Sequence, residues 1–291
     1  MRLTVLLVLA AGVPIGAPAT RADVDTKLRE IRWVAYAPTG YYPSESPPVL
    51  PDKESISADL AVLREAGFTG LVTYGAEMEA IPDVAAAMGF KAMLLGIWDP
   101  FDGEEVGKAL RAVAAHRNLI VGIVAGNEGL TNGRYSLKRL CTSMRSIRDA
   151  SHKPVTTTEP VDFLLAEPRI GECSDFISAN AHPFFSNRKA PGEAVQWTRE
   201  SWDAVRRAFP GKPALLKEVG LPTSGDAAMS EDTQKDYYTL LVKTDVVFCY
   251  FEAFDASPRF KPDVIEQSWG LWRSDRTPKR IVGALPWNTK Q

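Results

Sequence analysis

Eight short apolar runs alternate with longer amphipathic segments along this chain, and this alternation restricts the possible folds more than any other feature. The runs are rich in β-branched and aromatic residues, which is typical of buried strands. We predict strands over residues 32–38, 70–75, 91–98, 119–128, 154–160, 176–183, 213–220 and 246–254. Helical periodicity predicts helices near residues 53–66, 77–88, 103–116, 134–150, 161–166, 191–209 and 230–243.

Strands that alternate with helices form right-handed βαβ units and therefore a parallel sheet. Eight such units between residues 23 and 291 match a closed (β/α)₈ barrel better than an open doubly wound sheet. No GxGxxG fingerprint follows the first strand, which argues against a dinucleotide-binding fold. No repeat, low-complexity segment or Gly/Ser linker interrupts residues 23–291, so we predict one barrel domain there.

The N-terminal residues have the three regions of a secretory signal. Met1-Arg2 precedes an apolar stretch over residues 3–13, and small residues then offer cleavage after Ala19 or Ala22. The apolar stretch is too short for a stable membrane span. We predict a signal peptide over residues 1–22 and a secreted or periplasmic protein, and an uncleaved anchor is the alternative.

Charge and composition exclude some partners. The chain has 34 basic and 36 acidic residues, a formal net charge of -2, and no clustered Lys/Arg stripe of the kind that binds nucleic acid. Its hydrophobic content of 45% supports one packed core. We expect a globular monomer without nucleic-acid partners or stable membrane insertion.

The three cysteines are too few and too widely spaced for a zinc site or a dense disulfide framework. Cys249 lies in a strand-like run and is expected to be a buried thiol. Cys141 and Cys173 could pair in an oxidising compartment, but their spacing alone leaves the pairing open. Since no histidine cluster has metal-ligand spacing either, we expect neither a metal nor another cofactor.

Two glutamates lie at the ends of predicted strands. Glu128 ends the fourth strand and Glu218 ends the seventh, and catalytic groups of such barrels gather at the C-terminal ends of strands. Two carboxylates facing one another across the barrel mouth suit glycoside hydrolysis, where one protonates the leaving oxygen and the other attacks the anomeric carbon. For either glutamate alone, a helix N-cap or rim carboxylate is the simpler interpretation.

Both strand ends carry motifs of a known family. Asn127-Glu128 and the later run Glu218-Val219-Gly220-Leu221-Pro222 resemble the two catalytic signatures of family 17 glycoside hydrolases, the β-1,3-glucanases and related glucanosyltransferases. The stretches "VAYAPTG", "ANAHPFF", "YFEAFD" and "WGLWRSDRTPK" agree with that family in the same order. The similarity covers nearly all of the chain after residue 22, and it implies a (β/α)₈ barrel.

The resemblance assigns roles to individual residues. It makes Glu128 the general acid/base and Glu218 the nucleophile of a retaining mechanism, with carboxyl groups about 5–5.5 Å apart. It makes Asn127 the donor to the sugar 2-hydroxyl, although Asn also suits a turn that precedes Gly129. The further predicted substrate-binding residues are Tyr36, Tyr74, Trp98, Asn180, His182, Glu252, Phe260 and Lys261.

Several of these predictions have alternatives. Tyr74 and Trp98 could equally belong to the core, and His182 is expected to form hydrogen bonds because His116 and His152 lie away from the barrel mouth. Lys217 is expected to point toward the helices by strand alternation, without a catalytic role.

The chain also departs from the family pattern. An insertion after Asp255 displaces the expected aromatic and cation to Phe260-Lys261, and no glutamate directly follows Asp255 as it does in many relatives. Leu221 replaces a frequent tryptophan, which weakens one sugar-stacking surface.

We therefore predict hydrolysis of β-1,3-glucan through a covalent glycosyl-enzyme intermediate. Glucanosyl transfer by the same intermediate is the first alternative, because the motifs do not show whether water or a sugar hydroxyl resolves it. A barrel that binds carbohydrate without chemistry is the second, since fold alone does not determine function.

Overall fold

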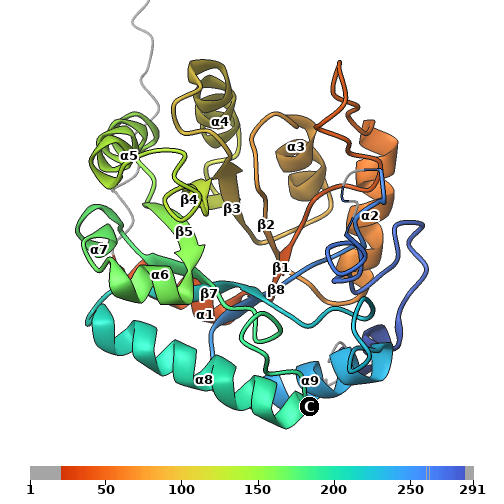
Figure 1. The fold of residues 1–291 in the computed structure, drawn as a ribbon. Coiled ribbons are helices and arrows are strands. Elements are labelled where there is room, and N and C mark those ends of the chain that lie inside the picture. Colours follow the sequence, from red (N-terminus) through yellow and green to blue (C-terminus); the bar gives the residue numbers. More distant parts are fainter. Residues whose placement is uncertain (1–20, 260, 262, 286–291) are drawn as a thin grey trace, which may run out of the picture.

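The computed structural model describes residues 21–259, 261 and 263–285, and it forms a closed barrel of eight parallel strands inside a layer of helices (Figure 1). The barrel closes where β1 pairs with β8, with Trp33 opposite Cys249. The predicted (β/α)₈ barrel is confirmed. The strands are β1 (Trp33–Ala35), β2 (Gly70–Val72), β3 (Ala92–Ile97), β4 (Ile120–Asn127), β5 (Val155–Pro160), β6 (Ile177–Asn180), β7 (Ala214–Val219) and β8 (Phe248–Tyr250).

Every strand falls within its predicted range. Strands β2, β3 and β7 are buried along their whole length, because one face packs inside the barrel and the other packs under helices. This explains why β2 and β3 are continuous apolar runs and not alternating ones.

Within the described residues, the helical layer contains the seven predicted helices, two α-helices that were not predicted, and a 3₁₀ helix that was not predicted either. Its elements are α1 (Arg21–Glu30), α2 (Lys53–Glu65), α3 (Ala80–Ala87), α4 (Gly103–Ala115), α5 (Leu137–Ser151), α6 (Val161–Ala166), α7 (Ile170–Cys173), α8 (Pro191–Ala208), α9 (Glu231–Leu241) and the 3₁₀ helix η1 (Arg280–Ala284). The unpredicted helices α1 and α7 are short, and α1 is polar over most of its surface.

Side-chain caps explain where several helices begin. The Asp52 side chain accepts the backbone N–H of Ser55 at 2.8 Å at the start of α2, and Asp102 accepts that of Glu104 at the start of α4. Ser230 caps α9 in the same way. Each cap satisfies a donor that the helix itself cannot pair.

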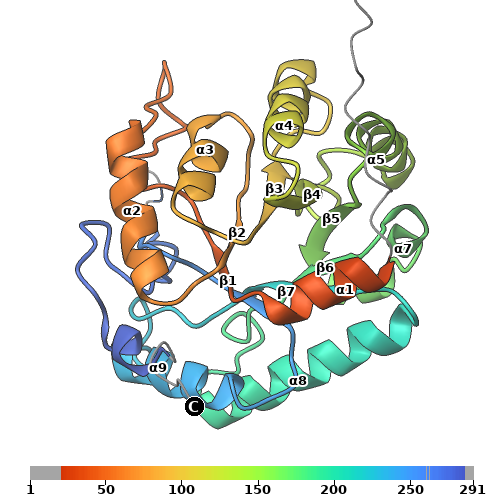
Figure 2. The same cartoon turned by 180° about the vertical axis from the view of Figure 1, so that it is seen from behind.

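The first helix lies against the barrel on the side seen in Figure 2, beside β7. Leu28 of α1 is buried, and its carbonyl accepts the indole N–H of Trp33 at 3.0 Å. This contact fastens α1 to the beginning of β1.

Two of the three cysteines are joined. Cys141 of α5 and Cys173 of α7 form a disulfide with Cα atoms 5.4 Å apart, which settles the pairing that their spacing left open. Cys249 is a buried free thiol, as predicted. Within the described ranges, no helix has the length and apolarity needed to cross a membrane. The predicted signal peptide lies almost entirely in residues 1–20, outside the described residues.

Candidate active site

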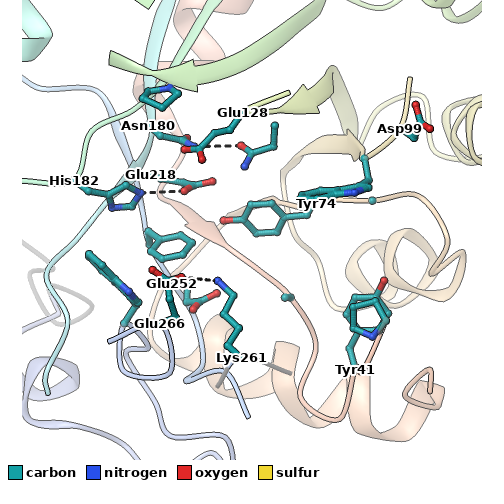
Figure 3. Close-up of a pocket in the computed structure, with 18 of the residues that line it drawn as sticks. Tyr41, Tyr74, Asp99, Glu128, Asn180, His182, Glu218, Glu252, Lys261 and Glu266 are labelled. Carbon is teal, nitrogen blue, oxygen red and sulfur yellow. Dashed lines mark hydrogen bonds and ion pairs between the residues drawn. The ribbon is translucent and has the colours of Figure 1, made fainter. Parts of the chain in front are cut away.

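A cleft of about 1050 Å³ opens at the C-terminal ends of the strands, and residues at or after all eight strands line it. Figure 3 shows its central part, with Glu128, Asn180, His182 and Glu218 together on one side. Of the eleven predicted site residues, nine line this cleft: Asn127, Glu128, Tyr74, Trp98, Asn180, His182, Glu218, Glu252 and Lys261.

The backbone at Glu128 has a conformation that few side chains adopt. Glu128 has φ 53° and Gly126 has φ 83°, both in the left-handed region. A Cβ on Gly126 would lie 2.0 Å from the hydroxyl of Tyr135, and one on Gly129 would meet the same side chain. The local sequence therefore turns the chain sharply where β4 ends and directs the Glu128 side chain into the cleft.

Strand β5 holds that turn in place. The backbone N–H of Glu128 donates to the Thr158 carbonyl at 2.7 Å. The buried Glu159 carboxylate accepts the N–H of Leu130 at 2.9 Å and both the N–H and hydroxyl of Thr131 at 3.0 and 2.7 Å. Glu159 was not singled out from the sequence, and it fixes the loop after Glu128.

Asn180 connects two other predicted site residues. Its Nδ2 donates to Glu128 Oε1 at 2.8 Å and to Asn127 Oδ1 at 3.3 Å. The second bond makes Oδ1 the acceptor of the Asn127 side chain and leaves Nδ2 as its donor. The first leaves Glu128 Oε2 as the oxygen that can carry a proton toward a ligand.

Glu218 is buried and is held by two donors. His182 Nε2 donates to Oε2 at 3.1 Å, and Lys217 Nζ donates to Oε1. Burial alone would raise the pKa of Glu218, but the positive charge of Lys217 and the hydrogen bond from His182 outweigh it and lower this pKa to about 2. Glu218 is therefore an ionised carboxylate at ordinary pH.

The position of Lys217 corrects the sequence-based expectation. Alternation was expected to turn its side chain toward the helices, whereas its ammonium lies on Glu218 and 4.4 Å from the centroid of the Tyr74 ring. The reason is a bulge in β7. Ala179 of β6 pairs with Leu216 and Asn180 pairs with Glu218, so Lys217 is an extra residue that breaks the alternation.

A second group of charged residues lies below His182 and Glu218 in Figure 3. Lys261 Nζ donates to Glu266 Oε2 at 2.9 Å, and Glu252 lies beside them. Burial, with a smaller contribution from the charge of Glu218, raises the pKa of Glu252 to about 8 against the opposing charge of Lys261. Glu252 is thus a neutral acid that can donate a hydrogen bond near neutral pH.

Tyr74 and Trp98, for which core packing was the alternative, both line the cleft. The Tyr74 hydroxyl is directed toward Glu218 in Figure 3, and burial raises its pKa well above the usual value. Trp98 is 49% exposed, and the Arg134 guanidinium lies 4.6 Å from its ring centroid. The backbone N–H of Trp98 donates to Glu105 at 2.7 Å, which anchors this aromatic surface at the rim.

Tyr36 is not part of the cleft, contrary to the prediction. Its hydroxyl donates to Asp59 of α2 at 2.9 Å, and Asp59 also pairs with Arg276 at 2.8 Å. The side chain therefore faces the helical layer, where it connects β1 to α2. Phe260 lies outside the described residues, and Leu221 is fully buried.

Other cleft residues were not selected from the sequence, among them Phe185, Trp269, Glu266 and Tyr41. Phe185, which is 62% exposed, and Trp269 belong to stretches that carried the family resemblance, but neither was singled out there. Glu266 follows Lys261 by five residues and pairs with it. Tyr41 donates its hydroxyl to Glu77 across the cleft rim, and no sequence pattern marked it.

Several buried polar atoms of cleft residues have no hydrogen-bond partner among the described residues. They are Tyr74 Oη, Asn180 Oδ1, His182 Nδ1, Glu252 Oε1 and Trp269 Nε1. A buried polar atom left unpaired costs about 1–3 kcal/mol. A ligand rich in hydroxyl groups would offer both donors and acceptors to this set. No three His, Cys, Asp or Glu side chains of the described chain form a group that could hold a metal ion.

Comparison with known proteins identifies relatives. The family model described as "BtgE/BtgC glycoside hydrolase domain" matches residues 34–270. "Probable beta-glucosidase btgE" of Aspergillus terreus is 28% identical over 239 residues, which are 75% of this chain and 42% of that protein. The protein of the same name from Aspergillus fumigatus is 27% identical over 243 residues, 76% of this chain and 42% of its own length. The chain thus spans less than half the length of these relatives.

Solved structures share the fold at low identity. A β-1,3-glucanosyltransferase of Rhizomucor miehei, an active-site mutant in complex with laminaritriose, superposes with a TM-score of 0.73 and 21% identity over 86% of this chain and 96% of its own. CJP38, a β-1,3-glucanase and allergen of Cryptomeria japonica pollen, has a TM-score of 0.68 and 18% identity, with coverage of 86% and 97%.

Proposed function

Because the chain belongs to the BtgE/BtgC glycoside hydrolase domain family, we propose that it is a retaining glycosidase that cleaves β-1,3-glucosidic bonds, with Glu218 as nucleophile and Glu128 as general acid/base. We place it in family 17 of the glycoside hydrolases on the strength of its two glutamate motifs. Substrate binding is assigned to Asn127, Asn180, His182, Glu252, Tyr74, Trp98 and Lys261.

One observation carries this proposal: two carboxylates in different environments share one cleft with buried polar atoms that have no partner in the described part of the chain. Glu218 is buried and ionised between two donors. Glu128 lies at the end of β4 with one oxygen bound to Asn180. A glycosidase that forms a covalent intermediate needs such a pair, since one carboxylate attacks while the other carries a proton.

In the first step, a carboxylate oxygen of Glu218 attacks the anomeric carbon and forms an ester. The glycosidic bond breaks, and Glu128 gives its proton to the departing oxygen, so that the aglycone leaves as an alcohol. Asn127 Nδ2 donates to the sugar 2-hydroxyl, and this bond strengthens as positive charge develops at the anomeric carbon.

In the second step, Glu128 acts as a base. It takes a proton from water as the water oxygen attacks the anomeric carbon, and the bond to Glu218 breaks. Each step inverts the anomeric centre, so the product keeps the β configuration. The Lys217 and His182 donors stabilise the Glu218 carboxylate as it leaves.

The β-1,3 linkage is supported by the sequence motifs and by the β-1,3-glucanosyltransferase and β-1,3-glucanase that share the fold, the first of which is in complex with laminaritriose. An aromatic group at the cleft, in which His182 meets Phe185, Phe251 and Trp269 edge to face, suits the apolar faces of pyranose rings. We also propose that the protein is exported, because its N-terminal residues have a signal pattern and disulfides such as Cys141–Cys173 persist in oxidising compartments.

Mass spectrometry of products from laminarihexaose over time tests the proposal, with cellohexaose as the linkage control. Shorter products alone indicate hydrolysis, and products longer than six sugars indicate glucanosyl transfer by the same intermediate. Glu218→Ala should lose turnover and recover part of it with azide, giving a glycosyl azide of inverted configuration. Glu128→Ala should retain the first step for substrates with good leaving groups. An unchanged laminarihexaose, or the same rescue pattern in both variants, would contradict these assignments.

A further inference from the structure

We infer that Lys217 is a positioning residue for the proposed reaction: it keeps the Glu218 carboxylate ionised and correctly oriented from beneath the cleft. The inference rests on the proposed role of Glu218 as nucleophile. It goes beyond that role, because it explains the ionisation of the Glu218 carboxylate by a cation that the substrate does not contact.

Lys217 is enclosed by protein. Only 1% of its side chain is exposed, and it does not line the cleft, so its ammonium cannot meet a sugar. It donates to Glu218 Oε1 on one side and lies 4.4 Å from the centroid of the Tyr74 ring on the other. An ammonium between a carboxylate and an aromatic face has two favourable electrostatic contacts and little freedom to move.

The bulge in β7 makes this arrangement possible. Toward β6, Lys217 is the extra residue in β7. Toward β8, the register also shifts, because Leu216 pairs with Phe248 and Val219 pairs with Tyr250. Regular alternation would have turned Lys217 and Glu218 to opposite faces. Because of the bulge, the side chains of the consecutive residues Lys217 and Glu218 meet. The register of β7 thus places a cation next to the Glu218 carboxylate.

The two donors to Glu218 come from different elements and bind different oxygens. Lys217 of β7 binds Oε1, and His182 after β6 binds Oε2. Two donors on two oxygens restrict rotation of the carboxylate plane, which fixes the direction from which it can attack. Of these donors, His182 lines the cleft and Lys217 does not.

The burial of Glu218 makes a cation necessary. Removal from water favours the protonated, non-nucleophilic acid, and the positive charge of Lys217 opposes that tendency. The titratable and charged groups facing it are Tyr74 after β2, His182 after β6, Lys217 of β7, Cys249 of β8, and Glu252 and Lys261 after β8.

A purely structural role is the alternative, because a buried lysine needs a carboxylate partner for stability alone. The two roles predict different measurements. Loss of a structural ion pair lowers the melting temperature and leaves the pH profile of the active fraction unchanged. Loss of a positioning cation shifts the acid limb of the kcat/KM pH profile to higher pH, because this limb reports ionisation of the nucleophile in the free enzyme.

The test uses kcat/KM for 2,4-dinitrophenyl β-laminaribioside from about pH 2 to about pH 7, since its good leaving group makes the first step insensitive to Glu128. The variants are Lys217→Met, Lys217→Gln and Lys217→Arg. Lys279→Met is the matched control, because Lys279 is also buried and pairs with a carboxylate, Asp255, at 2.6 Å outside the cleft lining. Glu218→Ala defines the background rate, and thermal melts accompany each profile.

We expect the acid limb of Lys217→Met and Lys217→Gln to rise by about 1–3 pH units, so that kcat/KM on that limb falls roughly tenfold or more relative to each variant's own plateau. Lys217→Arg should restore much of the low-pH activity. Lys279→Met should have a lower melting temperature than the wild type, with the acid limb of its kcat/KM profile at the wild-type pH. If Lys217→Met fails to fold, Lys217→Gln carries the test. An unmoved limb in the folded Lys217 variants would overturn the inference. A wild type no faster than Glu218→Ala would instead overturn the proposed function, and the inference with it.

Discussion

Asn180 Nδ2 donates to Glu128 Oε1 at 2.8 Å and so links the end of β6 to the end of β4. The same residue is paired with Glu218 in the β6–β7 ladder. Asn180 therefore touches one candidate catalytic carboxylate with its side chain and lies beside the other through its backbone, which places both within one rigid part of the barrel.

Replacing Asn180 with alanine tests this link. We expect Asn180→Ala to lower kcat/KM on β-1,3-gluco-oligosaccharides by about 10–100-fold, because Glu128 loses the side chain that orients it; this fall corresponds to about 1.4–2.7 kcal/mol of transition-state stabilisation. Steady-state kinetics measures the loss, and Asn118→Ala, at an exposed position before β4, is the control. Equal kinetics for the two variants would show that Asn180 does not orient Glu128.

Two buried carboxylates hold different loops and should give different kinetic effects. Glu159 binds the loop after Glu128, whereas Glu105 accepts the N–H groups of Ala76, Trp98 and Asp99 at the rim. Glu159→Gln should mainly lower kcat, and Glu105→Gln should mainly raise KM through the Trp98 surface. The reverse split in kinetics on laminarihexaose would contradict this assignment.

Glu252 should make stability depend on pH. Its pKa is raised from the ordinary 4.5 to about 8, first by burial, so the folded protein keeps a proton that the unfolded chain has lost. Stability from this group therefore falls as pH rises from about 4.5 to about 8, by a few kcal/mol at most. Glu252→Gln should flatten that fall in urea unfolding at several pH values. A slope identical to the wild type would disprove the protonated state.

The disulfide should stabilise the fold. Cys141 and Cys173 enclose a loop with a sequence separation of 32 residues, and closing a loop of this size in the unfolded chain stabilises by about 3–4 kcal/mol. The double variant Cys141→Ser/Cys173→Ser should lose about this much free energy of unfolding in urea titrations. A reducing agent should then destabilise the wild type but leave the double variant unchanged, and a wild type insensitive to reduction would contradict the prediction.

Tyr36→Phe separates stability from binding. The variant loses the hydrogen bond to buried Asp59, which should cost about 1–3 kcal/mol of unfolding free energy. KM for laminarihexaose should not change, because Tyr36 does not line the cleft. A raised KM with unchanged stability would return Tyr36 to the substrate site.

The fold was predictable because its signals are local. Most strands are short runs rich in apolar and β-branched residues, and the caps Asp52, Asp102 and Ser230 mark helix starts in the sequence. The helices α1 and α7 were missed because neither has a long apolar periodicity. Nine of the eleven predicted site residues line the cleft, since the ends of parallel strands necessarily meet at one edge.

The sequence-based predictions were wrong where strand pairing or a distant partner determines the direction in which a side chain points. Lys217 was expected to face the helices, but the bulge that turns it inward is set by pairing with β6 and β8 and leaves no mark in the sequence. Tyr36 follows the short strand β1, and its direction depends on the buried partner Asp59, 23 residues away. Glu159 and Glu105 were also missed, because their hydrogen-bond donors are mainly backbone N–H groups that take up these positions only in the folded loops.

Labelling of the nucleophile is the most direct test of the central claim. The protein is incubated with 2,4-dinitrophenyl 2-deoxy-2-fluoro-β-laminaribioside, which releases dinitrophenolate as a stable ester forms between the anomeric carbon and the attacking carboxylate. Peptide mapping by mass spectrometry then locates the sugar. We predict one sugar per protein on the peptide that contains Glu218. A label on any other residue, or none in a protein that turns over the unfluorinated substrate, would contradict the account.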